Sequence, residues 1–364
     1  MQSQWGQVAA TNELRYLSAY PPSWELSSDH PDSAQLNCQS RLKVYGPRGL
    51  QLAFICAKSL IEHQGVELQD WRKVREVWEQ NEAGESDAKQ LGVSSPYPFH
   101  PATPILAALP VALFFHEDPV KLRQKLQQLA DIWQNSNELS DGFFAVGYAI
   151  AQALQHKLNP VALIPQIITY LEEDTALVAL LVQVQIMLEQ AASLEVAVTQ
   201  LYKQAIAAAE KQNLISASHS IRSPATQLNQ RVASSLPIAL AFYSFLKTPE
   251  DLRLAVVRAA RSGIEPRLTC ALTGTLSGAY NSTAALPAGW RRLLAGKGKS
   301  PSAQEEPILS HQLTEAQIKT LTANLLAVWS GVCNGHQVEF PLDLIVSAPR
   351  VIRPHRFESG GDLR

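Results

Sequence analysis

Apolar residues recur along most of this chain at the three- and four-residue spacing of helices, and the alternation typical of strands is nearly absent. Residues 52–61 are almost continuously apolar, which predicts a buried helix, and residues 70–80 form a more polar, amphipathic pattern. From residue 104 to about residue 282 one helical pattern follows another. The stretch 161–209 is dense in Ala, Leu, Gln and Glu, which are good helix formers. The pattern therefore predicts an all-α protein.

Two segments of the predicted helical region resemble each other. Each has an apolar run containing Leu-Pro, at residues 109–115 and 236–242, followed by a polar break, a second proline and a charged helix. Asp118 and Thr248 are the predicted N-caps, with the prolines at the first helical position, where their missing N–H costs nothing. This similarity has two possible origins. Either the two segments independently use the same way of joining two helices, which we favour, or they arose by duplication.

Composition divides the chain into segments. The first is rich in Ser, Pro, Asn and Asp and is expected to be poorly ordered, whereas a later Gly-, Lys- and Ser-rich stretch is typical of a flexible linker. The predicted division is an N-terminal segment (1–45), a helical domain (46–294), a linker (295–312), a C-terminal helix with a packing segment (313–348) and a tail (349–364).

Charge and cysteine usage narrow the classes of partner. Hydrophobic residues make up 46% of the 364 residues and charged residues 18%, which is ample for a large core. The formal net charge of -2 argues against nucleic acid and anionic membranes as partners. Four widely separated cysteines show no zinc spacing. With no signal peptide in the N-terminal pattern and no apolar stretch of membrane-spanning length, we expect a cytoplasmic protein.

Three segments, in order along the chain, resemble the ADP-ribosylglycohydrolase family. Residues 51–62 (Gln-Leu-Ala-Phe-Ile-Cys-Ala-Lys-Ser-Leu-Ile-Glu) are similar to the helix after the family's Asp-Asp-Thr. Residues 109–122 resemble its Ala-Pro-Leu-Gly-Leu helix and Asp-Pro helix start. Residues 271–280 (Ala-Leu-Thr-Gly-Thr-Leu-Ser-Gly-Ala-Tyr) are similar to the small-residue helix after its Gly-Gly-Asp-Thr-Asp-Thr. The resemblance runs from about Tyr45 to Leu294 and implies an orthogonal multi-helix bundle.

The departures from the family concern its metal ligands. The family binds two magnesium ions with clustered carboxylates and a threonine hydroxyl, the hard oxygen ligands that this cation prefers. At the positions of the two ligand motifs this chain has Arg48, Gly49 and Leu50, and Glu265, Pro266, Arg267 and Leu268. Of these side chains only that of Glu265 could ligate a cation. The resemblance therefore implies the fold without the magnesium cofactor, and we assign no metal ligand.

The same resemblance places Arg48, Glu265 and Arg267 together, because the two loops that carry them meet at the family's metal centre. We therefore expect Gly49 to lie near Gly263. One interpretation is a ligand site in which the two guanidinium groups bind a phosphate or carboxylate. The other is an internal Arg–Glu salt bridge that fills the vacated pocket.

Other candidates for catalysis are weaker. His100 lies between prolines in an expected loop, and capping explains Asp118, beside His116 at a helix–helix turn. Residues 216–220 (Ser-Ala-Ser-His-Ser) lack an aspartate partner and a nucleophile elbow. Residues 297–299 (Lys-Gly-Lys) lack the strand and helix of a phosphate-binding loop. No catalytic residue is assigned.

The functional hypothesis is a pseudoenzyme: a catalytically degenerate ADP-ribosylglycohydrolase-like protein that acts as a binding or regulatory module. Its partner would be an anionic small molecule such as ADP-ribose, or another protein. One alternative is an active hydrolase of ADP-ribosyl N- or O-glycosidic bonds with relocated metal ligands. Another is a structural scaffold whose pocket is filled.

Overall fold

A computed structural model describes residues 48–76, 102–133, 137–171, 175–216, 224–295 and 315–331. These residues contain helices and no strand, which confirms the all-α prediction. None of the described helices is both long enough and apolar enough to cross a membrane. The predicted N-terminal segment 1–45, His100, the lysines at 297–299 and the tail 349–364 lie outside the described residues.

The helices follow one another with short connections. In chain order they are α3 (Arg48–Glu62), η1 (Thr103–Ala107), α5 (Ala108–Phe115), α6 (Pro119–Ile132), α7 (Asn137–Leu154), α8 (Leu163–Leu171), α9 (Ala176–Glu189), α10 (Leu194–Ser216), α11 (Pro224–Lys247), α12 (Leu252–Arg261), α13 (Pro266–Asn281), η2 (Thr283–Ala285), α14 (Ala288–Ala295) and α15 (Glu315–Ser330). A further helical segment spans 68–76.

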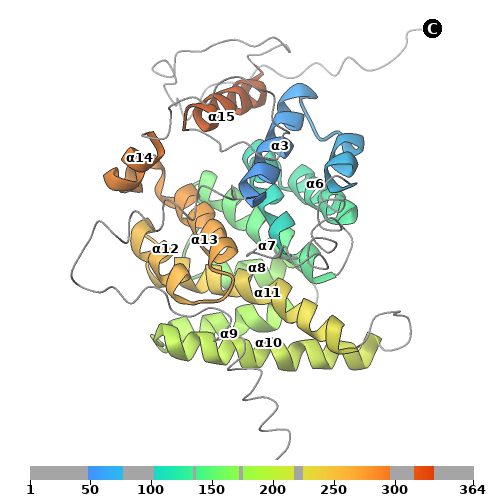
Figure 1. Ribbon diagram of the computed structural model, residues 1–364, viewed down its shortest axis with the longest axis vertical. Helices are drawn as coiled ribbons and strands as arrows, with labels where there is room; N and C mark the ends of the chain where they lie inside the picture. The colour runs from blue at the N-terminus through green and yellow to red at the C-terminus, as the bar shows by residue number, and fades with distance from the viewer. Residues whose placement is uncertain are drawn as a thin grey trace, which may run out of the picture.

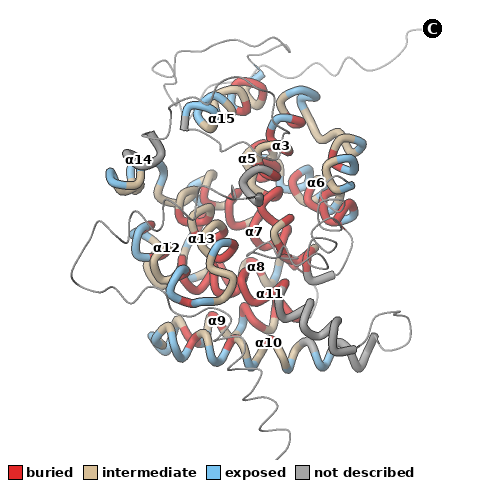
Figure 2. The backbone as a smooth tube through the Cα atoms, viewed as in Figure 1, coloured by how far each residue is buried: buried red, intermediate tan, exposed pale blue. Residues whose placement is uncertain are grey.

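Two central helices, α7 and α11, organise the bundle (Figure 1). Helix α7 packs against α5, α6 and α8, whereas α11 packs against α9, α10 and α12. Helix α13 packs against both central helices, which also contact each other. Figure 2 shows the consequence, a buried centre along α7 and α11 with exposed residues on the outer sides of the surrounding helices.

Small residues let the neighbours approach α7 closely. A Cβ at Gly142 would lie 2.6 Å from Ile105 Cδ1 and 2.8 Å from Ile238 Cδ1, on η1 and α11. A Cβ at Gly147 would lie 2.6 Å and 3.0 Å from the two methyl carbons of Leu126 on α6. All three contacting side chains are fully buried, so none can move away without disturbing the core.

One of the two predicted N-caps is correct. Asp118 caps α6, with its Oδ1 accepting the N–H groups of Val120 (3.1 Å) and Lys121 (2.9 Å), and Pro119 is the first helical residue. The interactions with these groups lower the pKa of Asp118, the hydrogen bond from the Lys121 N–H most of all.

The second predicted cap, Thr248, is wrong. Helix α12 begins at Leu252, and Asp251 caps it by accepting the N–H of Leu254 at 2.8 Å. Thr248 instead lies in a turn, where its Oγ1 accepts a hydrogen bond of 2.8 Å from Arg258. Aspartate therefore supplies the cap in both segments. Pro119 is the first residue of its helix, whereas Pro249 lies in the turn before α12, so the prediction that it starts the helix is also wrong.

The predicted C-terminal helix is present as α15, and it packs against α3 and α5. It buries Leu325, Ala327 and Val328, and its Trp329 ring stacks on His116 with centroids 5.2 Å apart. His116 Nδ1 lies 2.9 Å from the Leu113 carbonyl oxygen, an arrangement that orients the ring for this contact. His116 is thus a packing residue for α15.

The close approach of α6 to α7 predicts unequal effects of two glycine substitutions. Gly147→Ala should lower the free energy of unfolding by about 1–2 kcal/mol, because overpacking outweighs the better helix propensity of alanine. In Gly278→Ala, where nothing lies within 4 Å of the added Cβ, propensity acts alone and stability should rise by up to about 1 kcal/mol. Urea denaturation of both variants is the measurement, and a Gly147→Ala protein as stable as Gly278→Ala would contradict this packing.

Candidate functional site

The candidate site is the turn between α12 and α13, which pack against each other as consecutive helices. Two of its residues have left-handed backbone conformations: Gly263 with φ 71°, and Glu265 with φ 39° and ψ 58°. Glycine adopts this region freely, whereas a residue with a Cβ does so at a cost of about 1–2 kcal/mol. Glu265, the carboxylate of the predicted ligand site, thus lies at a strained position.

Side chains from both helices fix the backbone of this turn. The Ser262 hydroxyl donates to the Ala259 carbonyl at 2.7 Å and accepts the Ile264 N–H at 3.4 Å. From the other side, the Thr269 hydroxyl donates to the Ile264 carbonyl at 2.7 Å, and the Thr269 N–H donates to the Glu265 carbonyl at 2.9 Å. Because these bonds clamp the residues on either side, Glu265 is held in its left-handed conformation.

Glu265 and Arg267 influence each other electrostatically. Burial of the half-buried Glu265 side chain raises its pKa, and the positive charge of Arg267 partly offsets that rise. Glu265 occupies the N-cap position of α13 but makes no side-chain capping hydrogen bond, and Arg267 is exposed. The structure therefore brings two of the three predicted site residues into one turn.

The third, Arg48, is the first residue of α3, and its side chain lies outside the described part. Its convergence with Glu265 and Arg267, and the proximity of Gly49 to Gly263, stay predictions.

The side chains present at the turn do not fit a pair of magnesium ions. Magnesium prefers an octahedron of oxygen ligands supplied by carboxylates, phosphates and water. The turn offers one carboxylate, Glu265, with the cation Arg267 beside it. Within the described residues, no three His, Cys, Asp or Glu side chains lie close enough together to hold a metal ion.

Buried polar side chains on two helices that pack together, α7 and α13, were not anticipated from the sequence. Helix α7 carries Asp141, which is 6% exposed, and α13 carries Thr269, Thr273 and Ser277, all fully buried at successive four-residue steps. The four-residue recurrence of hydroxyls on α13 is visible in the sequence. Asp141 gave no comparable signal, because one acidic residue ahead of an apolar run is equally typical of an exposed first turn.

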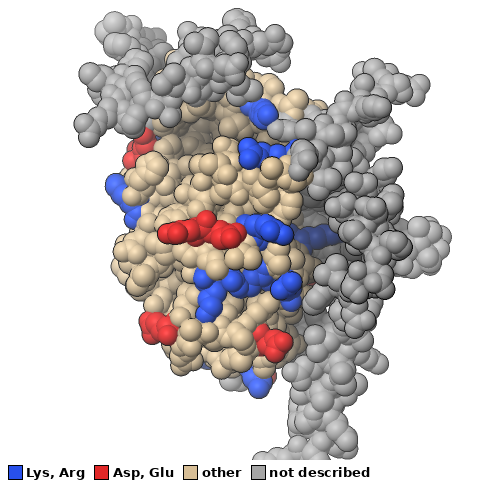
Figure 3. All heavy atoms as spheres, turned by 90° about the vertical axis from the view of Figure 1, so that its left-hand side faces the viewer, with Lys and Arg blue, Asp and Glu red and all other residues tan. Residues whose placement is uncertain are grey.

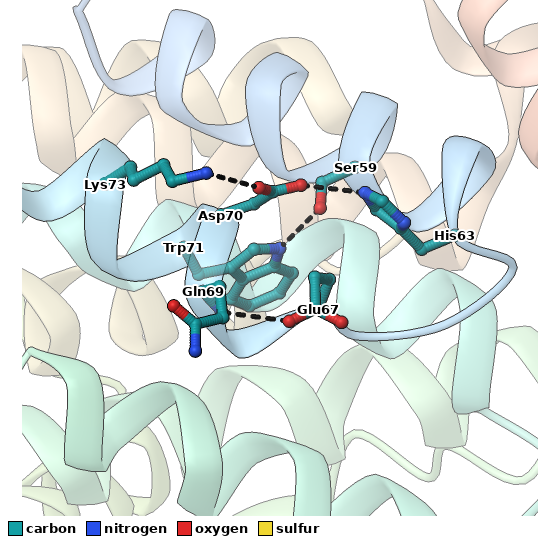
Figure 4. A network of polar contacts seen from close by, with 7 residues as sticks. All are labelled: Ser59, His63, Glu67, Gln69, Asp70, Trp71 and Lys73. Atoms are coloured by element: carbon teal, nitrogen blue, oxygen red, sulfur yellow. Dashed lines mark hydrogen bonds and ion pairs between the residues drawn. The ribbon is translucent and has the colours of Figure 1, made fainter.

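A second polar cluster, drawn in Figure 4, joins α3 to the segment 68–76. It contains Ser59, His63 and Asp70, residue types found in catalytic triads, with His63 Nε2 2.8 Å from Asp70 Oδ2. Ser59, however, is buried, and its hydroxyl accepts the indole N–H of Trp71 at 3.1 Å. Lys73 lies 3.5 Å from the other oxygen of Asp70. The cluster fastens two helices and presents no accessible nucleophile.

The two described cysteines are also structural. Burial raises the pKa of Cys56 to about 12 and that of Cys270 to about 11, so both remain thiols at neutral pH. Cys56 is fully enclosed in the core, and Cys270 donates to the Val256 carbonyl at 3.6 Å. Both thiols therefore act as small packing groups.

Taken together, the bundle and its turn define an all-helical protein whose candidate site lies where two consecutive helices meet. A model of the ADP-ribosylglycohydrolase family matches residues 48–321, about three quarters of the chain. The chain belongs to this family. The match begins at the first residue of α3 and ends inside α15, beyond Leu294, where the resemblance of the motifs ends. No curated protein matches the chain.

The raised pKa of Glu265 predicts a pH dependence of stability. The folded chain holds this proton at a higher pH than the unfolded chain does, so the free energy of unfolding should fall as the pH rises above 4.5, the ordinary glutamate value. Glu265→Gln should remove this loss, and Arg267→Ala should enlarge it by removing the compensating charge. Urea denaturation at several pH values is the measurement, with Glu250→Gln, an exposed carboxylate on the preceding turn, as the control.

The left-handed conformation of Glu265 predicts a separate backbone effect. Glu265→Gly and Glu265→Gln both remove the carboxylate, but only glycine relieves the strain, so the glycine variant should be more stable by about 1 kcal/mol. Gly263→Ala should show the opposite sign, with a loss of about 1 kcal/mol, since an added Cβ meets nothing within 4 Å and only the backbone is affected. Equal stabilities of the glycine and glutamine variants would refute the strained turn.

Proposed function

We propose that this chain is a catalytically degenerate member of the family that binds an anionic ligand such as ADP-ribose without hydrolysing it. The proposal is carried by the residues that stand where the resemblance places the family's two ligand motifs. At those positions the chain has Arg48, Gly49 and Leu50, and Glu265, Pro266, Arg267 and Leu268. Without two clustered cations, water lacks the activation that the family's metals supply.

Positive potential is nevertheless retained at the turn. Arg267 follows Pro266 in the first turn of α13, where the helix dipole also favours an anion. Glu265 leaves the first N–H groups of this helix without a side-chain cap, and its carboxylate interacts electrostatically with Arg267. A pyrophosphate could be held there by guanidinium hydrogen bonds, with Glu265 orienting one arginine instead of a metal.

Two other functions make different forecasts. An active hydrolase with relocated ligands would need further carboxylates, and the buried Asp141 on α7, which packs against α13, is the residue that favours this candidate. In a scaffold with a filled pocket, the interaction between Glu265 and Arg267 would be purely structural, and no ligand would bind.

ADP-ribose should raise the melting temperature of the wild-type chain, because a ligand that binds only the folded state stabilises it. Arg267→Ala should weaken ADP-ribose binding about tenfold or more, through the loss of charge-assisted hydrogen bonds. Glu265→Gln should strengthen it slightly by removing a nearby negative charge. Thermal shift and calorimetric titration measure these effects, with Arg72→Ala, an exposed arginine on the helical segment 68–76, as the matched control.

The same preparations should release no ADP-ribose from modified arginine, modified serine or O-acetyl-ADP-ribose, with or without magnesium. Magnesium-dependent release that is lost in Glu265→Gln or Asp141→Asn would establish the hydrolase instead. A destabilised Arg267→Ala protein, together with a wild type that does not respond to ADP-ribose, would establish the filled pocket.

A further inference from the structure

Positive charge is concentrated in one part of a chain that is slightly acidic as a whole. Residues 247–292 contain seven arginines and lysines against three carboxylates, whereas the formal net charge of the chain is -2. Figure 3 shows the side of the molecule that carries α12 and α14, where basic side chains gather near the centre with a few acidic ones beside them. The basic residues run from the end of α11 through α12, α13 and α14, and the net charge of the whole chain conceals them.

Some of these charges serve the fold. The half-buried Arg258 donates to the Ser244 carbonyl at 3.0 Å and to the Thr248 hydroxyl at 2.8 Å, so it fastens α12 to α11 and to the intervening turn. Burial lowers its pKa, as expected for an arginine in such a position. Asp251 is occupied as the cap of α12. Neither group is available to a partner.

Two arginines on the outer face of α12 have no such role. Helix α12 buries Leu252, Ala255 and Ala259, and on the opposite side it exposes Arg253 and Arg261. Neither arginine makes a hydrogen bond or ion pair with any described residue. The two arginines are eight positions apart, a distance of about 12 Å along the helix axis. We call the strip formed by Arg253, Leu254, Val257, Ala260 and Arg261 the α12 outer face.

The residues of the α12 outer face do not all stabilise the helix that carries them. Arg261 lies in the last turn, where a positive charge complements the helix dipole. Arg253 lies in the first turn, where the same dipole disfavours it. Next to it, Leu254 is 49% exposed. An unpaired cation at an unfavourable position beside an exposed leucine is better suited to an external contact than to folding.

The chemistry of the α12 outer face selects one class of partner. Two cations flank an apolar centre made of Leu254, Val257 and Ala260. A nucleic acid or an anionic bilayer would be recognised by continuous positive charge, which this centre interrupts. A helical protein segment with an acidic residue at each end of one face and an apolar residue between them matches both the charges and the spacing.

We propose that the α12 outer face is a docking surface for an acidic, amphipathic helical segment of a protein partner. The inference goes beyond the ligand site at the α12–α13 turn, because it uses neither Glu265 nor Arg267. Arg253 and Arg261 would pair with the partner's carboxylates, and Leu254 would be covered by its central apolar side chain.

A short synthetic helical peptide tests this surface directly. It carries glutamate at both ends of one face and leucine between them, and its binding to the full chain is followed by fluorescence anisotropy. The wild type should bind it, and the double variant Arg253→Gln/Arg261→Gln should bind it about tenfold more weakly, since each exposed pair contributes a factor of up to about five in affinity. Leu254→Ser should also weaken binding, an effect that charge alone would not produce.

The matched control removes equal charge elsewhere. The control variant Arg72→Gln/Lys203→Gln replaces two exposed basic residues, Arg72 on the segment 68–76 and Lys203 on α10. Its affinity for the peptide should stay within about twofold of the wild-type affinity. A peptide of the same composition in scrambled order should bind weakly. The proposal is overturned if the wild type does not bind, if both double variants lose affinity equally, or if a DNA duplex or phosphatidylserine vesicles bind the α12 outer face more tightly than the peptide.

Discussion

The packing of α13 against both central helices is the constraint on which the rest of the molecule depends. Helix α13 contacts α7 and α11 through a buried face that includes Leu268, Leu272 and Leu276, with buried hydroxyls between them. Since α12 precedes α13 by only a short turn and packs along it, the position of α13 also determines where the turn faces. The candidate site is therefore carried by rigid elements, as a binding site requires.

The packing of the bundle does not depend on the residues of the candidate site. Packing of the bundle uses small and apolar residues, such as Gly147 against Leu126, and none of these contacts needs a metal ligand. At the α12–α13 turn, by contrast, the described side chains offer the exposed Arg267 and a half-buried Glu265 whose pKa is raised by burial.

Backbone strain and a shifted pKa occur at the same residue of the α12–α13 turn, Glu265. Glu265 has a left-handed backbone and a pKa raised by burial, two unfavourable features at one residue. Hydrogen bonds of Ser262 and Thr269 hold its neighbours in place, so the cost is met by the surrounding structure. Strained backbone sustained in this manner is commonly found at binding and catalytic sites.

The sequence by itself determined the helical class, the Asp118 cap, the C-terminal helix and the family, because apolar periodicity, capping residues and short motifs act locally and leave a visible pattern. It failed at Thr248, since the choice between Thr248 and Asp251 as cap depended on Arg258 reaching across from α12. Only the tertiary structure decided that Asp141 is buried, that Ser59 is occupied by Trp71, and that Arg253 and Arg261 share an exposed face. Burial and pairing depend on which helices meet, and no local pattern of residues carries that information.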